Sequence, residues 1–558
     1  MRKDHATDTD AKRLPQLTWI LFLKFVDDLE RTTEAEAELG GKPFRPIIPA
    51  PYRWRDWAVD RRFTGNDLLA FLNQEEVDLP SAEEATAPTR GPGLFKRLAE
   101  LTAEGAEDRR LVVAQVFQGT RNEARDGHVL RDVLDNVNEI HFTASEDVHT
   151  LSAMYEGMLR EMRDASGQNG EFYTPRPLVK LIVQLTDPKL GEVVLDPACG
   201  TAGFLVETFE HLRLGATAPG QAATLQKSLL GVEVKPLPYL LAQMNLLLHG
   251  VENPQIDSEN SLGKKITEIT DRDRVDVILT NPPYGGEEKR GIPDNFPPDL
   301  RTSDTALLFL QLIVRKLRRP RDGRRGGRAA VVVPNGTPLT GGGVAARIRE
   351  MLLRECRLDL VLRLPGGVFA PYTDIESNVL FFEYGKPTDK VWFYEHPLPA
   401  GVNKYTKTRY LGYDEFEPMI AWWQAREETG QAWVVDIGAE IKAAKAHAEP
   451  LWAQADRLDK AARRDRDDAR TLQRAGGSDD DVAKVIARAK ETEASASEAR
   501  QEGDAAYWPA FNLERKNPRA LVDIDDRTPV QLAEALIEGE ERILSLLREV
   551  RAALGGQA

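Results

Sequence analysis

The chain has 558 residues, of which 41% are hydrophobic and 29% charged, and its formal net charge is −15 at pH 7. This length exceeds what one ordinary hydrophobic core accommodates, so we expect two or three domains. The acidity argues against nucleic-acid binding by bulk charge, although it leaves room for local basic surfaces.

Several classes of protein are excluded by what the sequence lacks. No run of about 18 apolar residues occurs, which predicts that no segment spans a membrane. The first 20 residues contain no continuous apolar stretch of the kind found in signal peptides. Cys199, Cys356 and eight scattered histidines form neither a disulfide framework nor a metal-ligand spacing. We therefore expect a cytoplasmic protein without a metal site.

Residues 1–145 are predicted to form a mostly helical N-terminal domain. Within residues 18–39, apolar side chains recur at helical spacing, and the segment then becomes wholly polar. Shorter helical patterns follow at 107–117 and 128–140, and a loop rich in Pro, Gly and acidic residues lies around 72–93.

Residues 146–415 are predicted to form an α/β domain, because short apolar runs alternate there with amphipathic stretches. The strand candidates are residues 192–196, 229–234, 275–280, 329–334, 359–365 and 378–385. This alternation is typical of a doubly wound, Rossmann-like sheet, in which ligands bind at the carboxyl ends of the strands.

An arginine-rich segment interrupts this alternation. Eight of the fourteen residues from Arg315 to Arg328 are basic. Such a segment is either a solvated loop between a helix and the next strand or a loop that contacts phosphate groups. The sequence leaves both interpretations open.

Residues 416–558 are predicted to form a helical C-terminal region. Charged residues and alanine dominate residues 439–503, and two glycines followed by Ser478 as an N-cap predict a helical hairpin. The final stretch has apolar residues at helical spacing from Leu532 through Leu536, Ile543 and Leu547 to Val550. A single helix with such a stripe must bury it against its own chain or another.

Two motifs indicate a ligand site at the carboxyl edge of the sheet. The first, VVLDPACGTAGF at 193–204, ends a strand with Asp196 and continues into a turn of small residues. Small residues let the backbone approach a ligand, but this turn matches neither a phosphate loop nor the dinucleotide pattern. The second ends a strand with Glu233, where an acid can accept hydrogen bonds from ribose hydroxyls.

A third motif is the most informative. Asn281, Pro282, Pro283 and Tyr284 follow the strand VDVILT directly. Two prolines fix the backbone, remove two N–H donors and end the strand, so the turn presents the asparagine and carbonyl oxygens as acceptors beside an aromatic ring. A turn needed for shape alone would not select the asparagine and the tyrosine together.

These three motifs resemble those of the amino-group DNA methyltransferases with NPPY-type motifs. The order of the motifs, with the segment GQNGEFYTPRP at 167–177 first, is the one associated with adenine N6 methylation. The resemblance implies S-adenosylmethionine as cofactor, and a flipped adenine whose amino group is held by Asn281 and the Pro282 carbonyl and stacked on Tyr284. The implied cofactor contacts are Glu171, Phe172, Tyr173, Thr174, Pro175, Arg176, Asp196, Thr201, Ala202, Gly203, Glu233 and Asn260. Asn260 stands where the family usually has aspartate.

The N-terminal segment FLKFVDDLE, the run from VVVPNGTP and the run VLRLPGGVF narrow the resemblance. Together they are similar to the modification subunit of type I restriction-modification systems, over most of residues 10–390. The resemblance implies that double-stranded DNA is a partner and that two such chains bind one specificity subunit. It leaves open whether a restriction subunit is also a partner.

Four other functions are alternatives to that of an adenine-specific modification subunit. A protein-glutamine or RNA methyltransferase can carry an NPPY motif, but the helical N-terminal region argues against it. A non-catalytic cofactor-binding subunit of a DNA defence complex is the main alternative, and Asn260 is its one support. A self-sufficient enzyme would need its own recognition domain, and residues beyond 390 show mainly charged helices. Cytosine C5 methylation would need a nucleophilic Pro-Cys pair, which neither Cys199 nor Cys356 provides.

Overall fold

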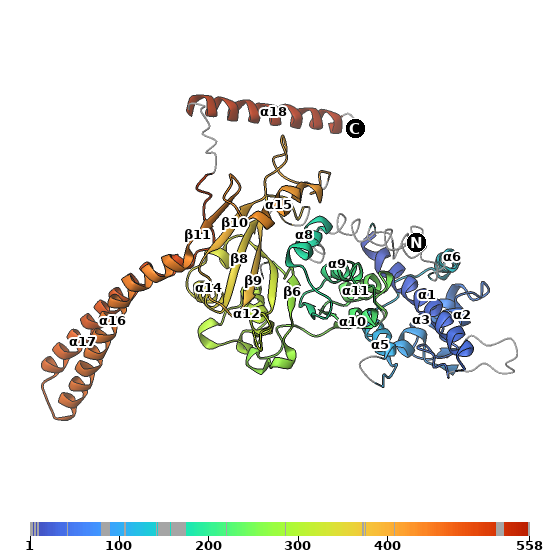
Figure 1. The fold of residues 1–558 in the computed structure, drawn as a ribbon, viewed down its shortest axis with the longest axis horizontal. Helices are drawn as coiled ribbons and strands as arrows, with labels where there is room; N and C mark the ends of the chain where they lie inside the picture. The colour runs from blue at the N-terminus through green and yellow to red at the C-terminus, as the bar shows by residue number, and fades with distance from the viewer. Residues whose placement is uncertain are drawn as a thin grey trace. The chain divides into compact units, whose positions relative to one another are not determined.

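A computed structural model gives the structure of the chain. It describes residues 4, 7, 10–41, 43–79, 90–104, 108–140, 142, 157, 174–218, 220–284, 286–370, 373, 375–406, 408–519 and 529–555. The chain divides into two compact units, residues 1–515 and 516–558. Figure 1 shows the elements along the chain.

The N-terminal part of the first unit is helical, as predicted. Its elements are α1 (Asp10–Leu39), α2 (Trp54–Trp57), α3 (Gly65–Asn73), β1 (Val77–Asp78), β2 (Arg90–Gly91), α4 (Leu94–Ala99), α5 (Arg109–Gly119) and α6 (Gly127–Asn138). The short β1–β2 pair lies where the sequence suggested only a loop. The predicted apolar stripe of α1 is buried: Trp19 and Phe22 are at most 1% exposed, and Trp19 packs edge-on against Phe95 with ring centroids 5.1 Å apart.

A nine-stranded mixed sheet forms the centre of the first unit. Its strands are β3 (Val194–Asp196), β4 (Leu229–Val232), β5 (Gln255–Asp257), β6 (Val277–Thr280), β7 (Arg328–Pro334), β8 (Cys356–Arg363), β9 (Ser377–Tyr384), β10 (Val391–Glu395) and β11 (Ala432–Val435). Their order is β11-β10-β8-β9-β7-β6-β3-β4-β5. β9 is antiparallel to β7 and β8, β11 is antiparallel to β10, and the other pairs are parallel. All six predicted strands are present.

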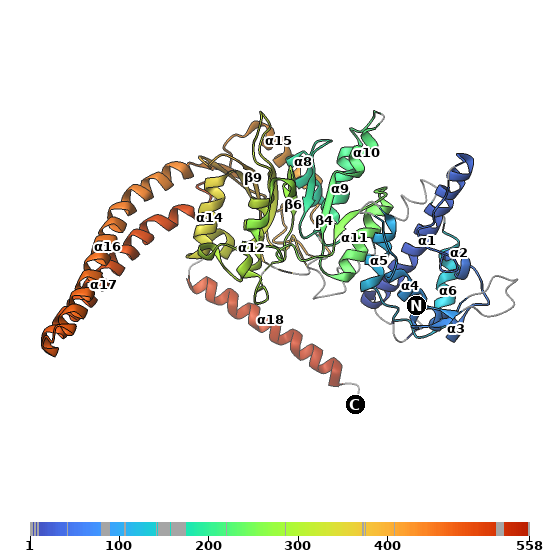
Figure 2. The same cartoon turned by 90° about the horizontal axis from the view of Figure 1, so that it is seen from below.

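Helices cover both faces of this sheet, which confirms the doubly wound prediction (Figures 1 and 2). One face carries α8 (Arg176–Thr186), α9 (Gly203–Arg213) and α11 (Pro236–Leu248), and the other carries α12 (Thr305–Lys316) and α14 (Val344–Glu355). Alternate residues of each strand enter opposite cores: Val277 and Leu279 of β6 join the first, and Ile278 joins the second. The shorter helices are α10 (Gln221–Gln226), α13 (Thr337–Thr340) and α15 (Glu417–Ala425).

The N-terminal helices pack on the first face of the sheet through α11, which α1 and α5 both contact. The Tyr239 hydroxyl donates a hydrogen bond to the Gln115 side chain across this contact, at 2.7 Å. Gln243 in turn donates to the Tyr239 hydroxyl at 2.9 Å, and its side chain is fully buried. These two hydrogen bonds hold the N-terminal helices against α11 and so against the first face of the sheet.

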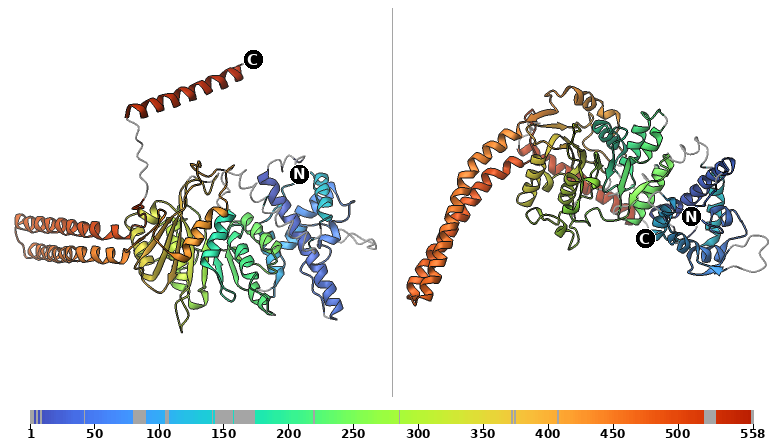
Figure 3. Two further views of the ribbon diagram at one scale, coloured as in Figure 1. Left: turned by 45° about the horizontal axis from the view of Figure 1, so that its top comes forward. Right: turned by 60° about the horizontal axis from the view of Figure 1, so that its bottom comes forward.

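The predicted hairpin is present as α16 (Ile437–Arg474) and α17 (Asp479–Tyr507), and Figure 3 shows the two helices side by side along their length. Ser478 caps α17 as predicted, accepting a hydrogen bond from the Asp481 backbone N–H at 3.1 Å. Buried alanines recur every seventh residue of α16 and let the helices approach closely. They are Ala448, Ala455, Ala462 and Ala469.

The predicted domain boundary at residue 415 cuts through the sheet, because β11 lies beyond it and pairs with β10. After the hairpin, η8 (Trp508–Phe511) returns the chain to α14, where the Arg349 guanidinium donates to the Phe511 carbonyl at 2.7 Å. The helical hairpin is therefore an excursion from the α/β fold, and the C-terminal region does not begin as a separate helical domain.

In the described residues of the second unit, the chain forms the helix α18 (Pro529–Gly555). Ile537, Ile543 and Leu547 on this helix are 59%, 52% and 60% exposed. The side chains of Leu532, Leu536 and Val550, which belong to the predicted stripe, lie outside the described residues. Within the described parts of the chain, no helix is long and apolar enough to cross a membrane.

Candidate active site

Three polar side chains that the sequence singled out stand at the carboxyl edge of adjacent strands. Asp196 ends β3, Glu233 directly follows the end of β4, and Asn281 directly follows β6. Since β6, β3 and β4 are neighbours and parallel, their carboxyl ends meet at one edge. The predicted ligand site is thus brought together by the topology of the sheet.

The glycine-rich turn after β3 folds back tightly. Gly200 and Ala202 both have left-handed backbones, with φ of +54° and +62°. The Cys199 N–H donates to the Val232 carbonyl at 3.0 Å, and the Ala202 N–H donates to the Cys199 carbonyl at 2.7 Å. An alanine at positive φ is uncommon and costs free energy, so this turn holds a conformation that the surroundings impose. Gly203 begins α9 directly after it.

Glu233 is fixed by backbone amides. Its carboxylate accepts hydrogen bonds from the N–H groups of Gly200 at 3.0 Å and Lys235 at 2.7 Å. The residue is 8% exposed, and burial raises the pKa of its carboxyl, although the two amide bonds oppose that rise. Each oxygen retains lone-pair capacity for one more donor, so both can still accept the predicted hydrogen bonds from ribose hydroxyls.

Asp196 is more deeply buried, at 1% exposed. Burial and, to a smaller extent, the nearby charge of Glu233 raise the pKa of its carboxyl to about 7, while the Thr280 side chain and the Ala198 N–H oppose the rise. Two acids this close to one another are stabilised in their ionised forms by a cation. The edge of the sheet therefore suits a positively charged ligand.

Asn281 presents an acceptor that nothing in the described structure uses. Its Nδ2 donates to the Thr174 hydroxyl at 3.1 Å, whereas its Oδ1 is buried and has no hydrogen-bond partner among the described residues. An unpaired buried carbonyl costs roughly 1–3 kcal/mol. This cost is compensated when a ligand donates an N–H group to that oxygen.

The rest of the NPPY turn shapes the space around this oxygen. Pro282 is buried and Pro283 exposed, so the turn is anchored on one side and open on the other. The Tyr284 ring packs edge-on against Phe369 with centroids 5.6 Å apart. Burial raises the pKa of the Tyr284 hydroxyl well above its usual range, with the Ser377 side chain opposing the rise. The ring is thus held neutral and in one orientation.

The remaining predicted cofactor contacts fall into two groups. Thr174, Pro175 and Arg176 lead into α8, and the Arg176 guanidinium donates to the Gly203 carbonyl at 2.9 Å, which joins this segment to the glycine-rich turn. Glu171, Phe172 and Tyr173 lie outside the described residues. Their predicted role in closing over the cofactor stays a prediction.

Thr201 and Asn260 are also near this edge. The Thr201 carbonyl accepts a hydrogen bond from the Asn245 side chain at 2.8 Å. Asn260 is exposed, and its Oδ1 accepts the Leu262 N–H at 2.9 Å within its own turn. The Ser261 hydroxyl donates to the Pro197 carbonyl at 2.6 Å, which ties the Asn260 loop to the glycine-rich turn.

Sequence reasoning missed the residues that support the site. Asn245 is fully buried in a largely apolar helix, Ser261 fixes a loop, and Phe369 orients Tyr284. Asn245 did give a signal, because a polar residue inside LLAQMNLLL needs a buried partner. Phe369 gave none, since its contact joins residues distant in the sequence.

The chemistry of these residues fits S-adenosylmethionine. The cofactor carries a sulfonium and an ammonium group, which two buried carboxyls complement, and its ribose hydroxyls are natural donors to Glu233. Among the described residues, no group of His, Cys, Asp and Glu side chains could hold a metal ion.

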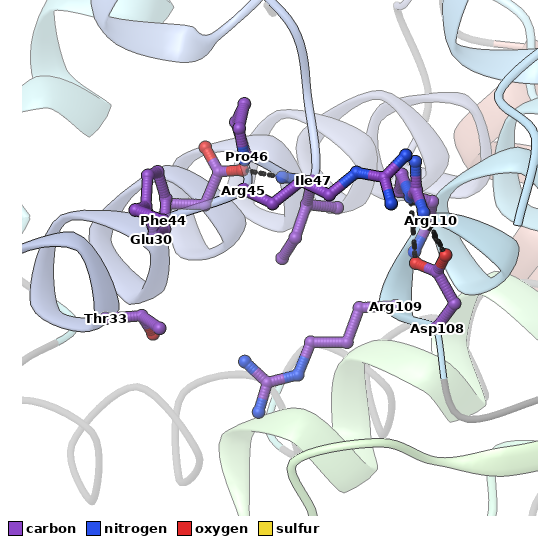
Figure 4. A pocket seen from close by; sticks show the side chains of 9 residues that line it. All are labelled: Glu30, Thr33, Phe44, Arg45, Pro46, Ile47, Asp108, Arg109 and Arg110. Carbon is purple, nitrogen blue, oxygen red and sulfur yellow. Dashed lines mark hydrogen bonds and ion pairs between the residues drawn. The ribbon is translucent and has the colours of Figure 1, made fainter. Parts of the chain in front are cut away.

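A hollow of about 360 Å³ lies among the N-terminal helices and the loop after α1 (Figure 4). Its charges are paired: Arg110 with Asp108, Arg45 with Glu104 at 2.6 Å, and Arg109 with Glu252 at 3.2 Å. The Glu30 carboxylate accepts the N–H groups of Ile47 and Ile48. These contacts brace the helices, and the Arg109 pair reaches the segment after α11.

The sheet and the site at its carboxyl edge together define an S-adenosylmethionine-dependent methyltransferase. The model of the N-6 DNA methylase family matches residues 146–450, and the chain belongs to this family. The resemblance inferred from the motifs is confirmed.

The chain is 44% identical over 448 residues to the type I restriction enzyme EcoEI methylase subunit of Escherichia coli, covering 78% of this chain and 85% of the relative. It is 31% identical over 407 residues to the EcoKI methylase subunit of Escherichia coli strain K12, covering 68% and 66%.

Solved structures agree. A modification subunit of a type I restriction enzyme from Vibrio vulnificus YJ016 is 55% identical, with a TM-score of 0.70 over 79% of this chain and 90% of that one. A chain from a study of type I restriction-modification assembly is 30% identical, with a TM-score of 0.68 over 100% and 96%.

Proposed function

We propose that this chain transfers the methyl group of S-adenosylmethionine to the N6 amino group of adenine in double-stranded DNA. The observation that carries the proposal is the buried Oδ1 of Asn281 at the carboxyl edge, which has no hydrogen-bond partner among the described residues and lies beside the acids of the cofactor site. The exocyclic amino group of adenine carries N–H groups, and one of them can donate a hydrogen bond to this oxygen.

The residues of the turn compensate for weak reactivity in the amino group. The nitrogen lone pair of adenine is delocalised into the ring, which makes it a poor nucleophile. Hydrogen bonds from its two N–H groups to Asn281 Oδ1 and the Pro282 carbonyl favour a more tetrahedral nitrogen, with its lone pair directed at the methyl group. The cofactor supplies an electrophilic methyl on a sulfonium leaving group. The base must leave the duplex to reach the turn, and Tyr284 offers it a stacking face.

The cysteines support this assignment against cytosine C5 methylation. Burial raises the pKa of the thiols of both Cys199 and Cys356. Neither side chain is a ready thiolate nucleophile. The direct displacement at an amino nitrogen needs no covalent intermediate with the enzyme.

A non-catalytic cofactor-binding role is the competing proposal. It rested on Asn260, whose side-chain oxygen is engaged in its own turn. That geometry leaves the Asn281 site unaffected, because the two residues follow different strands. We therefore favour the active enzyme.

We further propose that the chain works as the modification subunit of a type I system, with two copies binding one specificity subunit and, in a complete system, a restriction subunit. The exposed apolar side chains of α18, including Ile543 and Leu547, supply a surface for another helix. The chain alone should bind DNA weakly and without sequence preference, because recognition would lie on the partner.

Two experiments test these proposals. The complex is incubated with duplex DNA and labelled S-adenosylmethionine, and the digested nucleosides are analysed by mass spectrometry; N6-methyladenine is expected, and N4-methylcytosine would refute the substrate. A chain ending before Thr528 should lose co-purification with the specificity subunit but still bind cofactor. Efficient methylation of one defined sequence by the lone chain would contradict the multi-subunit proposal.

A further inference from the structure

The arginine-rich segment of the sequence forms a hollow of about 540 Å³ with the chain before β6. Five arginines and two aspartates line it, together with Pro320. The charged residues are Arg274, Arg318, Arg319, Arg321, Arg324, Asp271 and Asp322. A chain of net charge −15 therefore concentrates positive charge at one place.

This hollow lies at the edge of the sheet opposite the active site. Arg274 precedes β6, whose first residue is Val277, whereas Asn281 follows the last residue of that strand. Extended chain rises about 3.3 Å per residue, so the two residues are roughly 20 Å apart. The hollow is thus separate from the methylation site.

Two of these five guanidinium groups have no counter-charge among the described residues. Arg318 pairs with Asp276 at 2.7 Å. Arg321 lies 3.4 Å from Asp322, but these side chains are 81% and 84% exposed, so the pair contributes little. Arg319 and Arg324 have no ion-pair partner among the described residues, in contrast to the paired arginines of the N-terminal hollow, of which Figure 4 draws the Arg110–Asp108 pair.

A tight turn places two of the arginines against each other. Arg321 and Arg324 are antiparallel bridge partners, and the Arg324 N–H donates to the Arg321 carbonyl at 2.9 Å. Asp322 and Gly323 between them have φ of +53° and +79°, as in the tight turns of β-hairpins. Directly opposed like charges are destabilising. Repulsion between the two arginines therefore destabilises the turn, and a bound anion would reduce this repulsion.

Arg274 forms the buried wall of the hollow. Its side chain is 6% exposed, and one of its terminal nitrogens donates to the Leu317 carbonyl at 3.1 Å. Its Nε is 3.2 Å from the largely exposed Asp271 carboxylate and forms no hydrogen bond with any described residue. Burial lowers the pKa of Arg274, and the charge of Arg319 lowers it further. The exposed Asp271 carboxylate compensates this buried cation only in part, so a further anion in the hollow would stabilise it.

We propose that this hollow binds phosphate groups of a duplex DNA segment outside the methylated site. Arginine forks match phosphate oxygens in geometry and charge. The lining contains no large apolar side chain of the kind that anchors protein interfaces, which favours a nucleic-acid backbone over an acidic protein segment. The contact is independent of sequence, because phosphates carry no base information.

The test compares two full-length triple variants of equal charge change. The first carries Arg319→Ala, Arg321→Ala and Arg324→Ala. The control carries Lys460→Ala, Arg463→Ala and Arg464→Ala, which removes three exposed cations of α16 that have no ion-pair partner among the described residues. Binding of a fluorescent 30-base-pair duplex of arbitrary sequence is measured by anisotropy at several salt concentrations, and inorganic tripolyphosphate is titrated as a competitor.

We expect the first variant to lose about tenfold or more in affinity and its salt slope to fall by up to about 3, at about 0.9 per phosphate contact. The control variant should change affinity less than about twofold. Equal effects of the two variants, or an unchanged slope in the first, would refute the proposal. Loss of tripolyphosphate binding with DNA binding intact would also refute it and assign the hollow to a free polyphosphate. This result is independent of the methylation chemistry, since no methyl transfer is measured.

Discussion

Replacing Asn281 by alanine tests the chemistry most directly. The variant removes the buried oxygen that has no partner in the described structure, while Asp196 and Glu233, on other strands, stay in place. Loss of one preorganised polar contact in a desolvated site raises the barrier by about 2.7–4 kcal/mol. We expect kcat to fall on the order of a hundredfold or more, because each 1.36 kcal/mol is about tenfold in rate. Cofactor affinity should change little.

The assay measures single-turnover transfer of labelled methyl groups by the complete complex, and calorimetry measures cofactor binding by the same preparations. Thr174→Val is a companion variant, because it keeps the Asn281 oxygen and removes the acceptor of the 3.1 Å bond that orients the carboxamide. Calorimetry of this variant separates that loss from the predicted cofactor contact of Thr174. Its rate should lie between those of the wild type and Asn281→Ala. An unchanged rate in Asn281→Ala, with cofactor still bound, would show that this oxygen has no part in catalysis.

Three further outcomes are expected. Glu233→Ala should weaken cofactor affinity by roughly 1–3 kcal/mol, since a carboxylate held by two amides is lost, and unchanged calorimetry would contradict this. Cofactor affinity should rise as pH increases through about 7, because the bound cation favours ionised Asp196; binding should release protons, detected as a dependence of the calorimetric heat on buffer. His396, whose pKa burial lowers to about 4, is neutral when folded and protonates more readily when unfolded. Stability should therefore fall by up to about 3 kcal/mol as pH drops from 6.5 to 4, and His396→Gln should reduce this loss in thermal unfolding.

The strands that the sequence revealed are those with enough apolar residues to form a pattern. The six predicted runs all enter the sheet, and most of their residues are buried and apolar or β-branched. Of the three strands that were not predicted, β10 (VWFYE) does carry an apolar run, whereas β5 is only Gln255–Asp257 and β11 is four residues that follow a charged segment. Their strand state depends on pairing with β4 and β10, which is long-range information. For the same reason, the boundary predicted at residue 415 was misplaced.

The residues of the candidate site could be predicted from the sequence, but their contacts could not. Asp196, Glu233 and Asn281 were found because a polar residue directly after a buried strand stands at the carboxyl edge in any doubly wound sheet. Which side chains these residues contact depends on the fold of the whole chain. That Asn281 bonds Thr174 across 107 residues, or that Tyr284 meets Phe369, follows from the order of strands and loops in space. No local pattern encodes those contacts.

The distribution of charge explains how an acidic chain can work on a polyanion. Asp196 and Glu233 favour a cationic cofactor, but when ionised they repel phosphate groups that approach the same edge. Exposed charges are screened within about 8 Å at physiological salt, so attraction by the arginine hollow roughly 20 Å away cannot offset that local repulsion. A bound cofactor could, because its positive charge would compensate the two acids that hold it. Cofactor binding should therefore favour entry of the base, and by reciprocity a bound duplex should tighten the cofactor site.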